Sequence, residues 1–253
     1  MTIIPLPAFR DNYIWLLRAG TCAVVVDPGE AAPVIRYLAD EDLTLAAILI
    51  THHHPDHVGG VAELLAQAPV PVYGPAREAI AGIDHPVGEG DVVCLPGLGV
   101  ELRVFDIPGH TAGHVGYYGE SALFCGDTLF AAGCGRLFEG TPAQMFDSLQ
   151  KLAALPGDTR VYCTHEYTLS NLAFAAAVEP ANGAISERIT ASEAMRAANQ
   201  PTVPFPLSGE MLTNPFLRTH EPAVIRQAET QAGRGLTSPV EVFAALREWK
   251  NRF

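Results

Sequence analysis

The segment from Thr51 to His57, Thr-His-His-His-Pro-Asp-His, restricts the fold and chemistry of this chain more than any other. It places five titratable side chains within seven residues, and these repel one another or lose hydration energy unless a cation binds them. His52 and His54 are two residues apart, so in an extended backbone their side chains point the same way. Imidazole and carboxylate are preferred ligands of zinc and similar divalent metals, so we interpret the segment as a metal-binding loop.

An apolar run, residues 45–50, directly precedes this loop and has the character of a buried strand. Open α/β sheets carry their functional sites in loops at the ends of such strands. This position argues against the alternative of an exposed polyhistidine loop without a ligand.

Length and composition limit the class of protein. The 253 residues are enough for one large domain and a smaller appendage. The net charge of −12 argues against nucleic acid as a partner, because nucleic-acid binding relies on Lys and Arg. No apolar run approaches about 18 residues, which excludes a membrane span, and residues 1–10 do not resemble a signal peptide. We therefore expect a cytoplasmic protein, a monomer by default, whose five cysteines are small buried thiols.

The chain changes character near residue 166. Before it, short β-rich runs alternate with helical patterns, which predicts an α/β sandwich. After it, the pattern is helical with no convincing strand, and three prolines mark residues 200–209 as a loop. We predict a metal-binding domain over residues 1–165 and a helical domain over residues 166–253. The expected strands are 21–26, 46–50, 70–73, 100–105, 115–118, 122–125 and 161–163, and the expected helices are 33–40, 61–65, 169–178, 185–199, 222–232 and 239–249.

Three more candidate ligands, His110, Asp127 and His165, each follow a predicted strand. Taken alone, each would more often be a turn or capping residue. Their repeated placement at strand ends indicates a common cleft, and small residues just before them allow tight turns. These small residues are Gly109, Gly126 and Thr164.

Seven ligands are too many for one tetrahedral ion but suit two ions that share a carboxylate. Such a pair binds a water between the ions and makes hydroxide available near neutral pH. Zinc is the first choice, and iron or manganese also accept these ligands. In this arrangement His52, His54 and His110 hold one ion, Asp56, His57 and His165 hold the other, and Asp127 bridges them.

The pattern His52-x-His54-x-Asp56-His57, together with the three later ligands, resembles the metallo-β-lactamase superfamily. The resemblance implies an αββα sandwich with the metals at one edge of the sheets. The motif is strong evidence for the fold but weak evidence for the substrate, because proteins with one fold catalyse many different reactions.

A narrower resemblance covers nearly the whole chain. Five segments are similar to the hydroxyacylglutathione hydrolase (glyoxalase II) family, which adds a C-terminal helical domain to the metal domain. The resemblance implies hydrolysis of S-D-lactoylglutathione to D-lactate and glutathione, a step in methylglyoxal detoxification. The segments are residues 6–13, 133–141, 163–168, 214–218 and 247–250.

Glutathione carries two carboxylates, so an acidic protein needs local cations to bind it. Arg247 and Lys250 are three residues apart on one helix face, and Arg136 lies in a Gly-rich loop near Asp127. Without the resemblance, the safer interpretation of Arg247 and Lys250 is that their charges complement the dipole at the C-terminus of a helix. Tyr167 is a candidate donor to the glycine end of the tripeptide, with packing as the alternative.

The chain departs from the family at three places. Arg136 stands where many relatives carry Lys, and it keeps the charge with a different geometry. Phe138 replaces an aromatic hydroxyl found in some relatives and cannot donate, and Asn251 replaces an Asp.

The hypothesis for the reaction is attack of the bridging hydroxide on the thioester carbonyl. Thiolate is a good leaving group, so no dedicated general acid is required. We expect Asp56 to orient the hydroxide as well as to bind metal, and His53 to point away. Asn12 and Asp27 are candidate supports of the ligands, but turn and cap roles are the safer interpretation of both. His114 is expected to be a supporting or structural histidine.

Four other functions are compatible with parts of the pattern. A persulfide dioxygenase with a single iron shares the fold and motif but does not explain the helical C-terminal region. A nuclease is opposed by the acidic charge, and a lactonase by the C-terminal extension. A glutathione-binding module without catalysis would have lost a ligand, and all seven are present.

Overall fold

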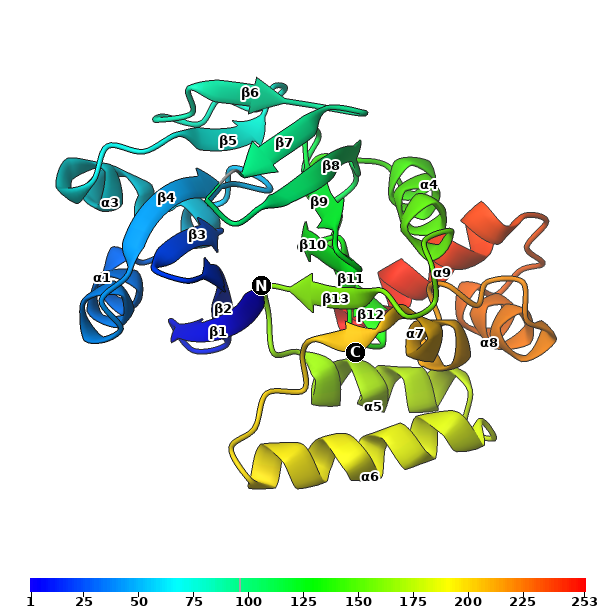
Figure 1. The fold of residues 1–253 in the computed structure, drawn as a ribbon. Coiled ribbons are helices and arrows are strands. Elements are labelled where there is room, and N and C mark those ends of the chain that lie inside the picture. The colour runs from blue at the N-terminus through cyan, green and yellow to red at the C-terminus, as the bar shows by residue number, and fades with distance from the viewer. Residues whose placement is uncertain (96) are drawn as a thin grey trace. The chain divides into compact units, whose positions relative to one another are not determined.

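The structure is a computed structural model that describes residues 1–95 and 97–253. These residues separate into two compact units. The first comprises Met1–Asp106 and Thr111–Gly126, and the second comprises Ile107–His110 and Asp127–Phe253. Figure 1 labels their helices and strands in chain order.

A six-stranded sheet, ordered β1-β2-β3-β4-β5-β6, forms the centre of the first unit. Its first three strands pair antiparallel, and β3 to β6 pair parallel. Parallel strands end at the same edge of a sheet, so the loops after β3 and β4 open at one edge. The strands are β1 (Thr2–Ala8), β2 (Asn12–Ala19), β3 (Cys22–Val26), β4 (Thr44–Leu49), β5 (Val72–Pro75) and β6 (His85–Val87).

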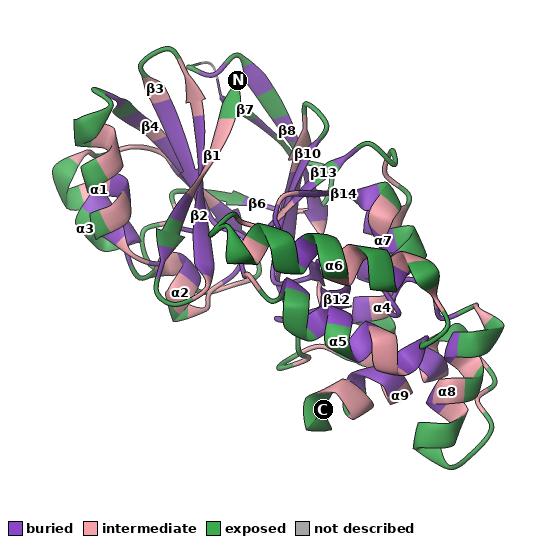
Figure 2. Cartoon of the chain, turned by 90° about the horizontal axis from the view of Figure 1, so that it is seen from below, coloured by how far each residue is buried: buried purple, intermediate pink, exposed green. Residues whose placement is uncertain are grey.

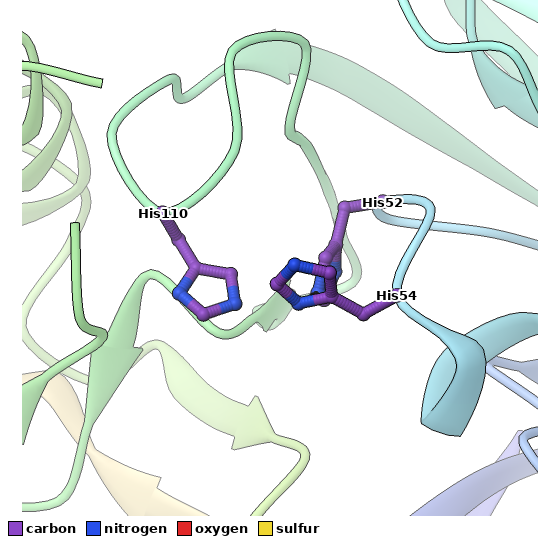
Figure 3. Close-up of side chains that lie close together, drawn as sticks. All are labelled: His52, His54 and His110. Atoms are coloured by element: carbon purple, nitrogen blue, oxygen red, sulfur yellow. Dashed lines mark hydrogen bonds between the residues drawn. The ribbon is translucent and has the colours of Figure 1, made fainter. Parts of the chain in front are cut away.

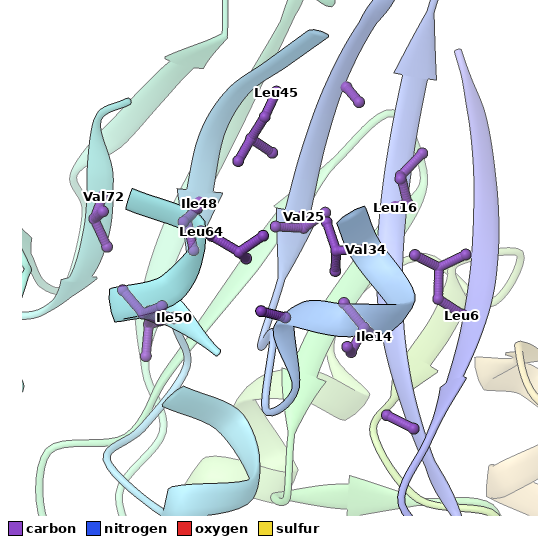
Figure 4. Packing of buried hydrophobic residues seen from close by; sticks show 14 of the residues in the cluster. Leu6, Ile14, Leu16, Val25, Val34, Leu45, Ile48, Ile50, Leu64 and Val72 are labelled. Atoms are coloured by element: carbon purple, nitrogen blue, oxygen red, sulfur yellow. The ribbon is translucent and has the colours of Figure 1, made fainter. Parts of the chain in front are cut away.

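Two helices, α1 (Ala31–Asp40) and α3 (Val61–Gln67), pack against this sheet. Figure 4 shows Val34 of α1 and Leu64 of α3 beside the strand residue Val25, and all three belong to one buried cluster. Figure 2 shows β2 and β4 mostly buried, as expected for strands with covered faces. Burial of these side chains is the main stabilising contribution in this unit.

Four more strands of the first unit pair antiparallel in the order β10-β9-β8-β7. The hydroxyl of Tyr117 in β9 donates to the Ile50 carbonyl oxygen at 2.8 Å, which ties this sheet to the end of the first one. The strands are β7 (Val92–Leu95), β8 (Val100–Asp106), β9 (Val115–Gly119) and β10 (Ala122–Gly126).

The second unit is mainly helical. Its first long helix begins at Thr141, whose side chain accepts from the Gln144 backbone N–H while the Gln144 side chain accepts from the Thr141 N–H, forming a capping box. Two short strand pairs, β11 with β12 and β13 with β14, complete the unit. Its elements are β11 (Leu129–Phe130), β12 (Gly133–Cys134), α4 (Pro142–Ala153), β13 (Arg160–Cys163), α5 (Thr168–Val178), α6 (Gly183–Ala197), β14 (Phe205–Pro206), α7 (Leu207–Thr213), α8 (Pro222–Ala232) and α9 (Pro239–Arg252).

Aromatic rings form the core between α5, α9 and the segment after α7. Phe174 stacks on Phe216 with ring centroids 5.9 Å apart and meets Trp249 edge to face at 5.0 Å. Phe216 also contacts Phe243 at 5.6 Å. Such offset and edge-to-face pairs add stability beyond the area they bury, so this cluster fixes α9 against α5.

The predicted order of strands and helices is confirmed, with bounds shifted by a few residues. One prediction is wrong: the C-terminal region contains a strand, because Phe205–Pro206 pairs with β13. Several elements were not predicted, among them α2 (Pro55–Val58), α4 and α7. The cysteine prediction is correct for Cys125, Cys134 and Cys163, but Cys94 is exposed.

Among the described residues, no helix is both long enough and apolar enough to cross a bilayer.

Replacing Leu64 by alanine should lower the free energy of unfolding by about 2–5 kcal/mol, since the side chain is buried between α3 and the sheet. Urea unfolding of Leu64→Ala beside Gln67→Ala, an exposed position on the same helix, measures the difference. Equal stability of the two variants would contradict the packing described.

Candidate metal centre and substrate pocket

The loop after β4 carries four predicted ligands. His52 and His57 are fully buried, and His54 and Asp56 are half-buried. Figure 3 shows the rings of His52 and His54 side by side, with His52 Nε2 and His54 Nδ1 3.0 Å apart. Two nitrogens bound to one tetrahedral ion at about 2.0–2.1 Å would be roughly 3.3 Å apart, so this spacing suits a shared metal.

The carboxylate of Asp27, at the end of β3, organises this loop. It is 2% exposed and accepts from the Thr51 backbone N–H at 2.8 Å and from the Thr51 hydroxyl at 2.7 Å. It also accepts from His57 Nδ1 at 3.0 Å. Asp27 therefore contacts and supports the metal loop, a role that the sequence indicated less strongly than a turn or cap role.

These contacts fix the protonation of two rings. A carboxylate only accepts hydrogen bonds, so His57 carries its proton on Nδ1 and presents the Nε2 lone pair. The Thr51 proton is directed at Asp27, so the Thr51 oxygen accepts from His52 Nδ1 at 3.1 Å, and His52 likewise presents Nε2. In the neutral form, both rings would thus have the tautomer that binds a metal through Nε2.

Asp56 has a separate support, the side-chain amide of Asn12. Its Oδ2 accepts from Asn12 Nδ2 at 3.0 Å and lies 3.8 Å from His57 Nε2. The amide at residue 12 thus supports a candidate ligand.

The second unit contributes three donors of its own: His110 after β8, Asp127 after β10 and His165 after β13. Asp127 Oδ2 lies 3.5 Å from His110 Nε2 and 3.3 Å from His165 Nε2, so one carboxylate faces two imidazoles. His110 Nδ1 donates to the Arg136 carbonyl oxygen at 2.8 Å, which again directs Nε2 at the carboxylate (Figure 3 shows the His110 ring).

Each unit therefore carries a cluster of imidazole and carboxylate donors, with the Nδ1 atoms of His52, His57 and His110 directed at acceptors, and this donor set fits a divalent metal. The candidate metal donors among the described residues include all seven that were predicted: His52, His54, Asp56, His57, His110, Asp127 and His165.

The other histidines near the loop have separate partners. His53 Nδ1 lies 2.9 Å from Glu78 Oε2, which agrees with the prediction that this ring points away. His114 donates to the Val115 carbonyl oxygen and stacks on His52, with centroids 4.5 Å apart, as a structural histidine would. Glu78 also accepts from the Gly113 N–H at 3.2 Å, a support that sequence reasoning missed.

Gly126, just before Asp127, confirms the expected need for a small residue. Its φ of 46° is in the left-handed region, and an added Cβ would lie 2.4 Å from Thr51 Oγ1 and 2.9 Å from the His114 ring. Any larger residue would displace the hydrogen bonds of the metal loop.

A cavity of about 410 Å³ in the second unit contains two candidate metal ligands and all five predicted substrate contacts. The same unit has a larger hollow of about 580 Å³, but none of the predicted site residues line it. The smaller cavity is lined by His110, Asp127, Phe130, Cys134, Arg136, Phe138, Tyr167, Ser170, Asn171, Arg247 and Lys250.

Three cations give this cavity a positive field in an acidic protein. Arg136 is exposed, whereas Arg247 is buried and donates through Nη1 to the Cys134 carbonyl oxygen at 2.8 Å. Burial, together with the charges of Arg247 and Arg136, lowers the pKa of Lys250 to about 8. The Lys250 ammonium also lies over the Phe174 ring at 4.9 Å.

Two aromatic rings flank the metal ligands of this cavity. Tyr167 stacks on His165 with centroids 4.7 Å apart and an interplanar angle of 4°. Phe138 contacts His110 edge to face at 5.2 Å and is 63% exposed. Both rings are placed to contact a ligand near the donors.

Sequence reasoning missed four residues that line the cavity: Phe130, Cys134, Ser170 and Asn171. The last two follow Tyr167 at helical spacings of three and four, so the periodicity of α5 could have indicated them. Phe130 and Cys134 lie in the β11–β12 hairpin, whose residues show no clear strand pattern.

Loss of the Asp27 carboxylate should weaken metal binding by about 10- to 100-fold, because Thr51 and His57 lose their common acceptor. We expect this for Asp27→Ala in chelator competition with zinc, with Asp40→Ala, an exposed carboxylate of the same unit, as the control. Equal zinc affinity of both variants, with both folded by circular dichroism, would show that Asp27 does not orient the ligands.

Comparisons with known proteins agree with this site. A family described as "Metallo-beta-lactamase superfamily" matches residues 8–165, and one described as "Hydroxyacylglutathione hydrolase C-terminus" matches residues 166–253. The superfamily implies divalent metal binding, which agrees with the donor set.

Curated relatives match over nearly their entire length. The chain is 53% identical to a hydroxyacylglutathione hydrolase of Nitrosomonas europaea, over 100% of this chain and 97% of that protein. It is 57% identical to one of Cupriavidus taiwanensis, over 100% of this chain and 99% of that protein. Among solved structures, the BLEG-1 B3 metallo-β-lactamase is 27% identical with a TM-score of 0.63, over 85% of this chain and 98% of that one.

The predicted fold class, a mixed α/β metallo-β-lactamase-type region followed by a helical one, is thereby confirmed. By its full-length similarity and by both family matches, the chain belongs to the hydroxyacylglutathione hydrolases of the metallo-β-lactamase superfamily.

Proposed function

We propose that the chain is a thioesterase that hydrolyses S-D-lactoylglutathione, and other S-2-hydroxyacylglutathiones, to glutathione and D-lactate. The observation that carries this proposal is the single cavity that joins two candidate metal ligands to three cations. A glutathione thioester has two carboxylates at one end and a reactive carbonyl at the other, and this cavity offers a complementary group for each. The names of the curated relatives support the same activity.

The metal centre in this proposal is dinuclear, with zinc as the first choice and iron or manganese as alternatives. Bound ions would supply a Lewis acid for the carbonyl and activate water near neutral pH. Asp127 is suited to bridge because its carboxylate faces two imidazoles, at 3.3 and 3.5 Å. One ion is assigned to His52, His54 and His110, and the other to Asp56, His57 and His165.

The role of the chain's own residues is to bind and orient the substrate. Arg136, Arg247 and Lys250 would hold the glutathione carboxylates, since cation–carboxylate hydrogen bonds are strong in a partly buried site. The Tyr167 hydroxyl would donate to the glycine end. Phe138, which has no hydroxyl, would contact the substrate through its ring alone.

Asp56 is the second residue proposed to act in the reaction. Its Oδ2 already accepts from Asn12, which fixes the orientation of the carboxylate next to His57. An oriented carboxylate would position the attacking water and accept a hydrogen bond from it. The thiol group of glutathione leaves as a thiolate, so we assign no general acid.

We extend the proposal to the setting of the enzyme. Residues 1–165 would form the metal-binding domain and residues 166–253 the glutathione-binding domain. The activity would serve methylglyoxal detoxification in the cytoplasm, and the chain would act as a monomer.

The decisive experiment follows the loss of S-D-lactoylglutathione absorbance with metal content determined on the same sample. We expect turnover with about two metal ions per chain, and at least a 100-fold loss in Asp127→Ala, because both facing imidazoles lose their shared carboxylate. Asp147→Ala, an exposed carboxylate on α4, is the matched control and should retain full activity.

Absence of hydrolysis, with one iron per chain and oxygen uptake on glutathione persulfide, would overturn this proposal. That outcome would favour the alternative, a persulfide dioxygenase with a single iron.

The binding of an uncleavable analogue should depend on pH through Lys250. Its pKa of about 8 means that the ammonium loses its charge between pH 7 and pH 9, so affinity for S-methylglutathione should fall by up to about tenfold over this range. In Lys250→Arg the charge persists to higher pH, so this part of the decline should disappear.

Isothermal titration of both proteins at several pH values measures the difference. Titration of the ligand itself affects both proteins equally. Parallel pH profiles would show that Lys250 does not contact the ligand.

A further inference from the structure

The main chain of the hairpin loop, residues 130–134, is held by polar side chains that come from the helices, in addition to the packing of its own buried side chains. Asn214 Nδ2 donates to the Gly133 carbonyl oxygen at 2.9 Å and to the Phe130 carbonyl oxygen at 3.3 Å. Asn171 Nδ2 donates to the Ala131 carbonyl oxygen at 3.0 Å, and Arg247 donates to that of Cys134. These donors come from α5, from α9 and from the residue after α7.

A further main-chain contact of the loop is made by an N–H. The Ala132 N–H donates to Glu210 Oε2 at 2.8 Å, and Ala132 itself has a φ of 53°, a conformation that L-residues rarely adopt. Such a conformation persists only where surrounding contacts determine it. The side chains from the helices supply those contacts.

Glu210 and Asn214 form a fully buried, hydrogen-bonded pair. Both are 0% exposed, and Asn214 Nδ2 donates to Glu210 Oε2 at 2.9 Å. Arg188 of α6 pairs with Glu210 Oε1 at 2.5 Å, which balances the buried charge. A buried ion pair is a weak source of net stability, so specificity of conformation is the better explanation for keeping it here.

The held loop connects three parts of the site. Asp127 lies three residues before Phe130, and Arg136 lies two residues after Cys134. The Arg136 carbonyl oxygen accepts from His110 Nδ1, so the loop also sets the orientation of that imidazole. A shift of the loop would therefore move a carboxylate, an imidazole and a pocket cation together.

We propose that Asn214 and Glu210 are positioning residues for the reaction, which act through the main chain of residues 130–134 on Asp127, His110 and Arg136. The proposal rests on the thioesterase function proposed above. In this proposal, two buried polar residues of the helical region maintain the relative positions of the donors Asp127 and His110 and of the cavity residue Arg136.

The test uses the full-length Asn214→Ala variant with its metals. We expect faster amide exchange in the peptide covering residues 128–136, lower zinc affinity, a lower kcat and a higher KM, with kcat/KM reduced by about 10- to 100-fold. Asn182→Ala is the matched control, because that amide donates to the Leu212 carbonyl oxygen of the same unit at 3.0 Å and does not touch the loop. Its exchange in 128–136, zinc affinity and kinetics should equal those of the wild type.

Two further variants keep the proposal testable if Asn214→Ala does not fold. Asn171→Ala removes one contact to the same loop, so amide exchange, zinc affinity and kcat/KM should change in the same directions but only by a few-fold. Glu210→Gln should loosen the same peptide, because the amide cannot balance Arg188.

A merely structural role would lower the melting temperature and leave zinc affinity, KM and kcat per folded molecule unchanged, and that result would overturn the proposal. The exchange and zinc readouts do not need turnover. If the wild type fails to hydrolyse the thioester, the proposed function fails while the positioning role is still tested.

Discussion

The metal donors depend on buried acceptors that hold the Nδ1 atoms of three imidazole rings. Asp27 holds His57 directly and His52 through the Thr51 hydroxyl, and the Arg136 carbonyl oxygen holds His110. A ring held in this way presents a lone pair where a cation is needed, so little reorganisation accompanies metal binding. The sheet contributes by ending β3 and β4 at the same edge, where Asp27 and the metal loop meet.

The sequence was sufficient for most of the fold, and it indicated the candidate donors that the structure places in clusters. Strands such as β3 and β10 were predicted because buried strands are continuous apolar runs, and the donors were predicted because they follow those strands. The short strand β14 was missed because its two residues lie in a proline-rich segment, where pairing with β13 is decided by tertiary contacts. Glu78 was missed because it supports His53 from 25 positions away, and no local pattern reports such a contact.

The cavity of the second unit has a local positive field although the protein has a net charge of −12. Three cations gather on one cavity, and burial lowers the pKa of Lys250 far enough for its charge to respond to moderate changes in pH. Arg247 keeps its charge, because a guanidinium does not lose its proton in this range. It is tied to the Cys134 carbonyl oxygen and lies over the Phe216 ring, so its position is fixed by the same loop that lines the cavity.

Main-chain atoms are the same whatever side chains a loop carries. The β11–β12 loop is held through such atoms by residues 40 to 113 positions away in sequence. Its shape is therefore set from the helices, and burial confines its own side chains as well: Ala132 packs with Leu172, Ala175 and Ile185, and a Cβ on Gly133 would lie 2.6 Å from the Asn171 side chain. A few amide and carboxylate groups of α5, α7 and the segment after α7 thus maintain the geometry next to Asp127, although most residues of the helical region lie away from it.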